Sequence, residues 1–174
     1  MQVLRNWLVV CVANFAGAVG LAVLVYLSGH ADMGSGAIGR TVVRIALAKQ
    51  ALPWSEAFFR GVLCNVLVCV AVWMAMAGRS VADKAVAMIF PITAFVAAGF
   101  EHSVANMYFV PFALFLTWLD PGFVAARGLD AHALTWGGFL ARNLLPVTLG
   151  NVIGGAALVG GVYWFVYLRP RAGE

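Results

Sequence analysis

The feature that most constrains this fold is one long apolar segment with a charged residue in its middle. Between residues 85 and 119 the only Asp, Glu, Lys or Arg is Glu101, and His102 follows it directly. The segment is longer than the roughly 20 residues that a straight helix needs to cross a bilayer. A charge at that depth costs about 2.5–3.5 kcal/mol on insertion scales and is tolerated where it faces other helices or a wet cavity. The segment therefore predicts a membrane protein with a polar interior site.

A helix breaker lies in the same place. Gly99 stands in the middle of the apolar segment, and Ser103 is suited to cap a second half-helix that starts near Val104. We expect two half-helices that meet near the membrane midplane, with His102 at the break. Unwound backbone at this depth is tolerated only where it is buried in protein or lines a cavity, as in many transporter sites. The alternative is a purely structural pair, in which Glu101 and His102 bond to each other.

Composition supports a membrane location for the whole chain. Hydrophobic residues make up 63% and charged residues 10%, whereas soluble domains carry about 25% charged residues. Three further stretches contain no Asp, Glu, Lys or Arg: residues 6–29, 61–78 and 143–168. The prediction is an all-α integral membrane protein. It has one transmembrane domain over residues 1–174, with spans at about 5–29, 56–77, 86–119 (broken) and 143–168.

Several other classes of protein are disfavoured. The net charge of +4 is spread over the connecting segments, and no basic run with interleaved aromatics suggests nucleic acid. The three cysteines, Cys11, Cys64 and Cys69, lie within spans and do not make a disulfide framework or a metal site. No H-E-x-x-H motif or recognisable nucleophile–base pair indicates an enzyme. The alternative is a membrane enzyme that uses Glu101 and His102. No cofactor is expected.

A separate amphipathic stretch covers residues 39–51. Three cations, Arg40, Arg44 and Lys49, alternate there with apolar side chains. The pattern predicts an interfacial helix whose basic side chains reach water. The cations could also attract anions to the mouth of a pore.

The first and last spans match each other without a gap. The matched positions are Arg5-Asn6 with Arg142-Asn143, Leu8 with Leu145, Asn14 with Asn151, and Gly17 with Gly154. If the broken segment crosses the membrane once, the matched spans run in opposite directions, which is the pattern of an inverted-topology repeat. We then expect the first repeat to include two spans ahead of residue 1, the second of them broken. Asn14 is expected to face protein or a cavity, because an amide facing lipid is costly.

Three runs carry a resemblance to a known family. They are G-F-E-H-S-V-A-N-M at 99–107, G-N-V-I-G-G at 150–155 and F-R-G-V-L-C-N at 59–65. On these runs, and over essentially its whole length, the chain resembles the formate–nitrite transporter family. The resemblance implies an aquaporin-like inverted-repeat helical bundle of six spans, of which this chain matches the third to the sixth. It also implies a homo-pentamer for a complete protein, in the inner or plasma membrane of the cell.

The resemblance further implies roles for individual residues. His102 corresponds to a central pore histidine, Phe95 to an apolar constriction and Lys84 to a vestibule lysine. Asn106 and Asn151 correspond to polar residues near the pore. Glu101 and Ser103 correspond to orienting or structural neighbours of the histidine.

The implied function is the passage of small monovalent anions of weak acids, formate or nitrite, across the lipid bilayer. Neutralising such an anion removes most of the cost of moving it into an apolar constriction. A histidine can stabilise the anion or give it a proton, so proton-coupled transport and channel-like passage both stay open. An apolar slit and one histidine separate related small anions poorly. The main alternative is a truncated, non-conducting subunit or remnant of such a transporter.

Overall fold

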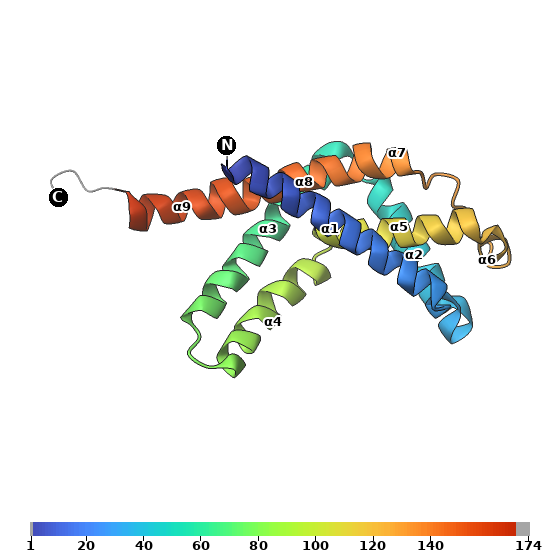
Figure 1. Cartoon of the computed structure of the whole chain (residues 1–174), viewed down its shortest axis with the longest axis horizontal. Helices are drawn as coiled ribbons and strands as arrows, with labels where there is room; N and C mark the ends of the chain where they lie inside the picture. Colours follow the sequence, from blue (N-terminus) through green and yellow to red (C-terminus); the bar gives the residue numbers. More distant parts are fainter. Residues whose placement is uncertain (1, 170–174) are drawn as a thin grey trace. The chain divides into compact units, whose positions relative to one another are not determined.

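The structure is a computed structural model that describes residues 2–169, and within that range it is helical, without strands. The elements in chain order (Figure 1) are α1 (Gln2–Leu27), η1 (His30–Asp32), α2 (Met33–Ala51), α3 (Trp54–Ala77), α4 (Val81–Ala97), α5 (Ser103–Leu119), α6 (Pro121–Ala125), α7 (Trp136–Gly138), η2 (Phe139–Leu144), α8 (Leu145–Val152), η3 (Ile153–Gly160), α9 (Gly161–Tyr163) and η4 (Trp164–Leu168). Here η1 is a 3₁₀ turn, and η2, η3 and η4 are π-helical.

The chain divides into two compact units, which are described separately. The first unit takes in residues 2–53 and 103–144, and the second takes in 54–102 and 145–169. The first unit therefore holds α1, η1, α2, α5, α6, α7 and η2. The second holds α3, α4, α8, η3, α9 and η4.

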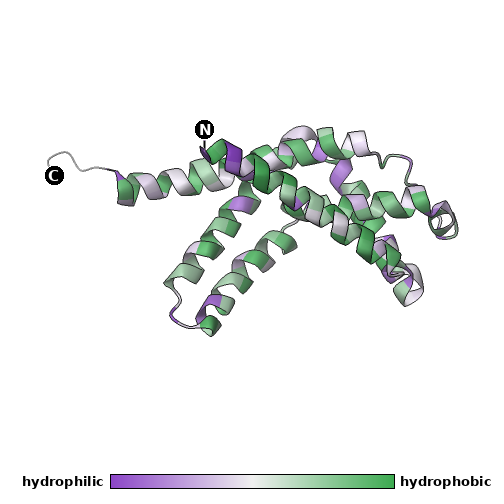
Figure 2. Cartoon of the chain, in the orientation of Figure 1, coloured by the Kyte–Doolittle hydropathy of each residue, from purple (hydrophilic) through white to green (hydrophobic). Residues whose placement is uncertain are grey.

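Three helical runs of the described chain are long and apolar enough to cross a membrane. They are Gln2–Leu27, Trp54–Ala77 and Trp136–Leu168, and Ser103–Leu119 is a shorter apolar helix. Figure 2 shows hydrophobic residues along most of α1 and α4. Because a helix rises 1.5 Å per residue, the 26 residues of α1 extend about 39 Å. The predicted class, an all-α integral membrane chain, is confirmed.

The core of the first unit forms where α1 and α2 pack against α5. Its fully buried members include Ala22 from α1, Val43 and Ala46 from α2, and Phe112 from α5. The apolar face of α2 is therefore covered by another helix. The predicted helix is present, and the amphipathic pattern gave its apolar face but not the helix that covers it; its place at the membrane surface stays a prediction.

A tight left-handed turn opens α2. Residues 34–36 all have positive φ, and at Gly36 a side chain would collide with the guanidinium of Arg127. That guanidinium lies 3.7 Å from the centre of the Phe123 ring and forms a 3.3 Å ion pair with Asp32. The left-handed backbone conformation therefore favours glycine at position 36, and a side chain there would displace the Arg127 guanidinium.

In the second unit, two glycines of the last helical run let it pack directly on the backbone of α3. A Cβ on Gly150 would collide with the carbonyl oxygen of Phe58, and a Cβ on Gly154 would collide with that of Val62. Small residues at this spacing allow such backbone contact between membrane helices.

The predicted break in the long apolar segment is confirmed. α4 ends at Ala97, α5 begins at Ser103, and Gly99 between them has φ +67°. Glycine is the residue that adopts this left-handed conformation without strain. The second half-helix starts within one residue of the predicted position.

The last helical run begins at Trp136 rather than at residue 143. Thr135 caps it, because its side-chain oxygen accepts a 2.9 Å hydrogen bond from the backbone N–H of Gly138. The helical run is thus longer at its start than the predicted span, and the span over about 143–168 stays a prediction.

Candidate functional site

The break in the long segment places His102 beside Phe95. The two rings are nearly parallel, with centroids 5.8 Å apart and planes at 24°, and both side chains are half-buried. Phe95 comes from the last turns of α4, and the left-handed turn at Gly99 brings the chain back past it. Two of the predicted site residues are therefore adjacent.

The backbone at the break is held by Asn151 of α8. The side-chain amide of Asn151 donates to the carbonyl oxygens of Gly61 at 2.8 Å and Glu101 at 3.0 Å. The backbone N–H of Glu101 donates to the carbonyl of Arg60 at 3.4 Å. Asn151 and Glu101 are both buried. Unwound backbone away from water needs such partners, so Asn151 joins the break to α3.

Asn65 extends this set of contacts from α3. Its side-chain amide donates to the backbone carbonyl of Asn151. Asn65 is not among the predicted site residues, although an amide in an otherwise apolar span was a usable signal, because such a group is costly without a partner.

Asn106 belongs to the first unit, on α5, and is completely buried. Its amide donates to the side-chain oxygen of Asn143 at 2.8 Å, and the Asn143 amide donates to the backbone carbonyl of Lys49 at 3.1 Å. Asn143 was noted only as half of the repeated Arg-Asn pair. Its role as a link between η2, α5 and the last turn of α2 was not predicted, since it depends on which helices meet.

Lys84 and Ser103 lie at helix starts. Lys84 is exposed in the first turn of α4, about 16 Å along the helix from Phe95 at 1.5 Å per residue. Lys84 is therefore not brought to the Phe95–His102 pair. Ser103 is buried in the first turn of α5.

A capping box fixes the start of α4 next to Lys84. The backbone N–H groups of Ser80 and Arg79 donate to the Asp83 carboxylate at 3.0 and 3.2 Å, and the Asp83 N–H donates to the Ser80 hydroxyl at 3.1 Å. These bonds, the one from the Ser80 backbone first, lower the pKa of Asp83 from its ordinary value.

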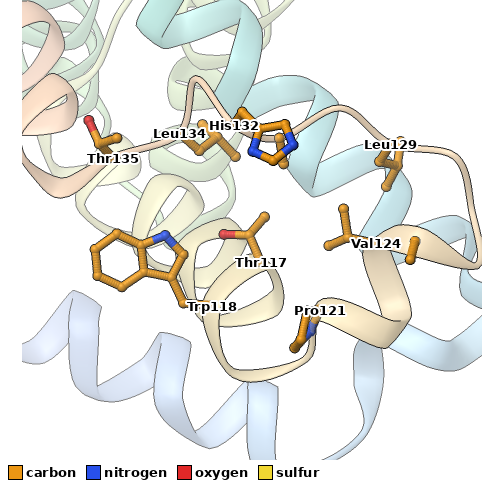
Figure 3. A pocket seen from close by; sticks show the side chains of 10 residues that line it. Thr117, Trp118, Pro121, Val124, Leu129, His132, Leu134 and Thr135 are labelled. Atoms are coloured by element: carbon orange, nitrogen blue, oxygen red, sulfur yellow. The ribbon is translucent and has the colours of Figure 1, made fainter.

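A cavity of about 420 Å³ lies in the first unit and contains none of the predicted site residues. Figure 3 shows its wall, which comes from the end of α5, from α6 and from the connector before α7. Its only titratable lining residue is His132, which is exposed. The cavity is otherwise largely apolar.

The chemistry available at the break is that of one imidazole beside an aromatic ring. An imidazole can donate or accept a proton near neutral pH, and the phenyl ring beside it is apolar. Among residues 2–169 no three His, Cys, Asp or Glu side chains are grouped so that they could hold a metal ion.

Several known proteins are similar to this chain over nearly its whole length. A family model described as formate/nitrite transporter matches residues 1–165. The formate channel FocA of Haemophilus influenzae is 44% identical over 163 residues, which is 91% of this chain and 57% of that protein. FocA of Escherichia coli K12 is 42% identical over 174 residues, covering 98% of this chain and 61% of that protein. The chain therefore spans about three fifths of the length of these curated relatives.

A solved structure titled "Pentameric formate channel with formate bound" superposes with a TM-score of 0.90 at 37% identity, covering 97% of this chain and 68% of that one. An "FNT family ion channel" gives a TM-score of 0.73 at 35% identity over 95% of this chain and 58% of that one. The fold of the described chain is thus that of a channel protomer over the matched length. On these grounds the chain belongs to the formate/nitrite transporter family.

Proposed function

We propose that this chain lines a conduit for small monovalent anions of weak acids, formate or nitrite, across the cell membrane. The observation that carries the proposal is the Phe95–His102 pair at a broken membrane helix. The structural relative with formate bound and the FocA relatives support formate as the first substrate to test. Membership in a family of transporters also argues against the membrane-enzyme alternative.

The mechanism rests on the cost of moving a charge into an apolar slit. A bare monovalent anion loses its hydration at the Phe95 ring, and this loss is costly unless the charge is paired or neutralised. His102, 5.8 Å from Phe95 between ring centroids, is placed to supply the positive charge or the proton. The acid then passes the ring nearly neutral. Whether the proton travels with the anion decides between symport and channel-like passage.

The other predicted residues take supporting roles in this proposal. Lys84, exposed at the start of α4, attracts anions to one mouth of the conduit. Asn151 keeps the break open by holding the Glu101 carbonyl. Asn106 keeps α5 in place through Asn143. The assembly proposed is one transmembrane domain per chain, with spans at about 5–29, 56–77, 86–119 and 143–168, in a homo-pentamer like the structural relative.

The test is uptake of radiolabelled formate into liposomes by two proteins. One is the 174-residue chain itself, and the other is a chimera in which this chain replaces the matching region of the H. influenzae relative. Saturable uptake by the chimera, competed by nitrite, is expected. Uptake by the chimera but not by the chain would favour the non-conducting alternative for residues 1–174 alone. An inactive but folded chimera would contradict the proposal.

A substitution at the constriction sharpens this test. In the chimera, Phe95→Ala should widen the slit and increase lactate uptake relative to formate several-fold, because size exclusion is lost. Phe90→Ala is the matched control on the same helix, since Phe90 is 69% exposed. Equal lactate-to-formate ratios in both variants would remove Phe95 from the conduit.

A further inference from the structure

A second cavity of the first unit lies where the last helical run begins. Its volume is about 820 Å³, and it shares His132 and Thr135 with the smaller cavity described above. Its wall combines the last turns of α2, the connector before α7 and the first turns of the helical run that starts at Trp136. The polar side chains and glycines of this wall are Gln50, His132, Thr135, Gly137, Gly138 and Arg142.

The ionisable side chains on this wall are basic. Arg142 and His132 line the cavity, and no Asp or Glu of the described chain does. Arg142 is exposed and forms no ion pair within residues 2–169. Asp130 accepts a 3.3 Å hydrogen bond from the backbone N–H of His132 but does not line the cavity. The positive charge of Arg142 is therefore uncompensated at this wall, and it attracts anions.

A buried amide supplies a donor from α2. Gln50 is 8% exposed, and its side chain pairs with the backbone of Thr135. The amide nitrogen donates to the Thr135 carbonyl at 3.1 Å, and the amide oxygen accepts from the Thr135 N–H at 3.4 Å. That nitrogen carries two N–H groups, and the second has no acceptor within residues 2–169. A buried donor without an acceptor is costly, and an anion in the cavity would satisfy it.

The helical run also presents its amino-terminal end to the cavity. The first N–H groups of a helix have no acceptor within it, and Thr135 satisfies those of Gly138 and Phe139. The N–H of Gly137 has no acceptor in the part of the chain that the structure describes. Because Gly137 carries no side chain, this N–H is open to the cavity, at the positive end of the helix dipole. Arg142 follows Gly138 by four residues, so the two share a face of the run.

We propose that this cavity binds a phosphate group. Three kinds of donor from separate parts of the first unit line it: the Arg142 guanidinium, the second N–H of the Gln50 amide and the N–H of Gly137. A phosphate group has three acceptor oxygens and up to two charges, and an arginine binds it with two parallel hydrogen bonds. Formate and nitrite have fewer acceptor oxygens and a single charge, and the cavity is larger than either ion fills. Binding here does not depend on the anion pathway proposed above.

The phosphate belongs either to a lipid headgroup or to a dissolved molecule, and the two share the chemistry that the cavity recognises. Tryptophans of membrane proteins gather at the level of the lipid headgroups. Trp136 opens the helical run at the cavity, and Trp118, which lines the smaller cavity, is 57% exposed. A lipid phosphate is therefore tested beside a soluble one.

Equilibrium dialysis of the full chain, in detergent and phosphate-free buffer, measures binding of two radiolabelled probes: inorganic phosphate and short-chain phosphatidylglycerol. Saturable binding of at least one probe is expected, and the tighter probe identifies the source. Arg142→Gln should raise the dissociation constant of that probe about tenfold, because the bidentate donor is lost. Gly137→Leu should raise it by a similar factor, because the new side chain covers the open N–H without removing a charge.

Arg5→Gln is the matched control, since Arg5 holds the repeat position of Arg142 and is exposed outside the cavity. It should leave the dissociation constant unchanged. Without a probe, Arg142→Gln and Gly137→Leu should keep the wild-type melting temperature, because Arg142 has no ion pair within residues 2–169 and a Cβ on Gly137 meets nothing within 4 Å.

Three results would overturn the proposal. The first is the absence of saturable binding of both probes by the wild-type chain. The second is an equal loss of affinity in Arg5→Gln and Arg142→Gln, which would show attraction to the net charge rather than a site. The third is unchanged affinity in folded Gly137→Leu, which would place the bound phosphate elsewhere.

Discussion

At the scale of single residues, Asn151 holds the candidate site together. It joins an unwound carbonyl at Glu101 and a helical carbonyl at Gly61, both away from water. His102 and Glu101 stand out in the sequence as ionisable residues at membrane depth. Asn151 was predicted through the repeat and the family resemblance, and its partners were not, because they lie 50 and 90 positions away in the chain.

We expect Asn151→Leu to lower the free energy of unfolding by about 2 kcal/mol or more, because two buried carbonyls lose their donor. The matched control is Asn14→Leu, the same substitution at the repeat position where the amide is exposed. This control should change the free energy of unfolding of the chain by less than about 0.5 kcal/mol. Denaturant unfolding in detergent measures both variants, and similar losses would contradict the assigned contacts.

Asp83 gives a pH-dependent prediction at the start of α4. Because the pKa of Asp83 is lowered in the folded chain, its stabilising effect is present above the ordinary carboxyl pKa. The effect is lost as the pH falls through the lowered value. Hydrogen exchange at the first turn of α4, corrected for intrinsic rates, should therefore rise at acid pH. Asp83→Asn should remove this dependence, and an unchanged profile in that variant would show that the capping box is not its cause.

At the scale of elements, the packing of the last helical run on α3 depends on glycine. Gly154→Ala should destabilise the second unit by about 1–3 kcal/mol, the typical cost of overpacking, because the new methyl group meets the Val62 backbone rather than a movable side chain. Gly17→Ala is the control at the matched repeat position, where there is open space. Thermal unfolding in the same detergent compares the two. A Gly17→Ala loss as large as that of Gly154→Ala would contradict the packing.

The elements also show how far the sequence predicts this fold. The break between α4 and α5 was predictable, since length, a glycine and a lone charge all point to it. The start of the last run at Trp136 was missed because two glycines follow it and a side-chain cap compensates for them. The burial of α2 was missed because an amphipathic pattern is the same whether lipid or α5 covers the apolar face. The pairing of Asn106 with Asn143 could not be predicted from local pattern, as it requires knowing which helices meet.

At the scale of the whole molecule, the same asparagine–glycine pair occurs once in each unit, as Asn14 with Gly17 and as Asn151 with Gly154. The chain spans about three fifths of its curated relatives, while 97% of it superposes on a channel protomer. The pathway and the pentamer are therefore proposals about an assembly to which this chain contributes the Phe95–His102 pair.

We propose that the His102 ring eases a small acid past Phe95, and formate-driven proton uptake into liposomes by the chimera tests this role most directly. Internal pH is followed with a trapped dye in the wild type, in His102→Phe and in His132→Phe, a control outside the proposed conduit. We expect His102→Phe to abolish proton uptake or to lower formate flux at least about tenfold, a barrier change of about 1.4 kcal/mol. His132→Phe should behave as the wild type. Formate flux and its pH dependence left unchanged by His102→Phe would contradict the claim.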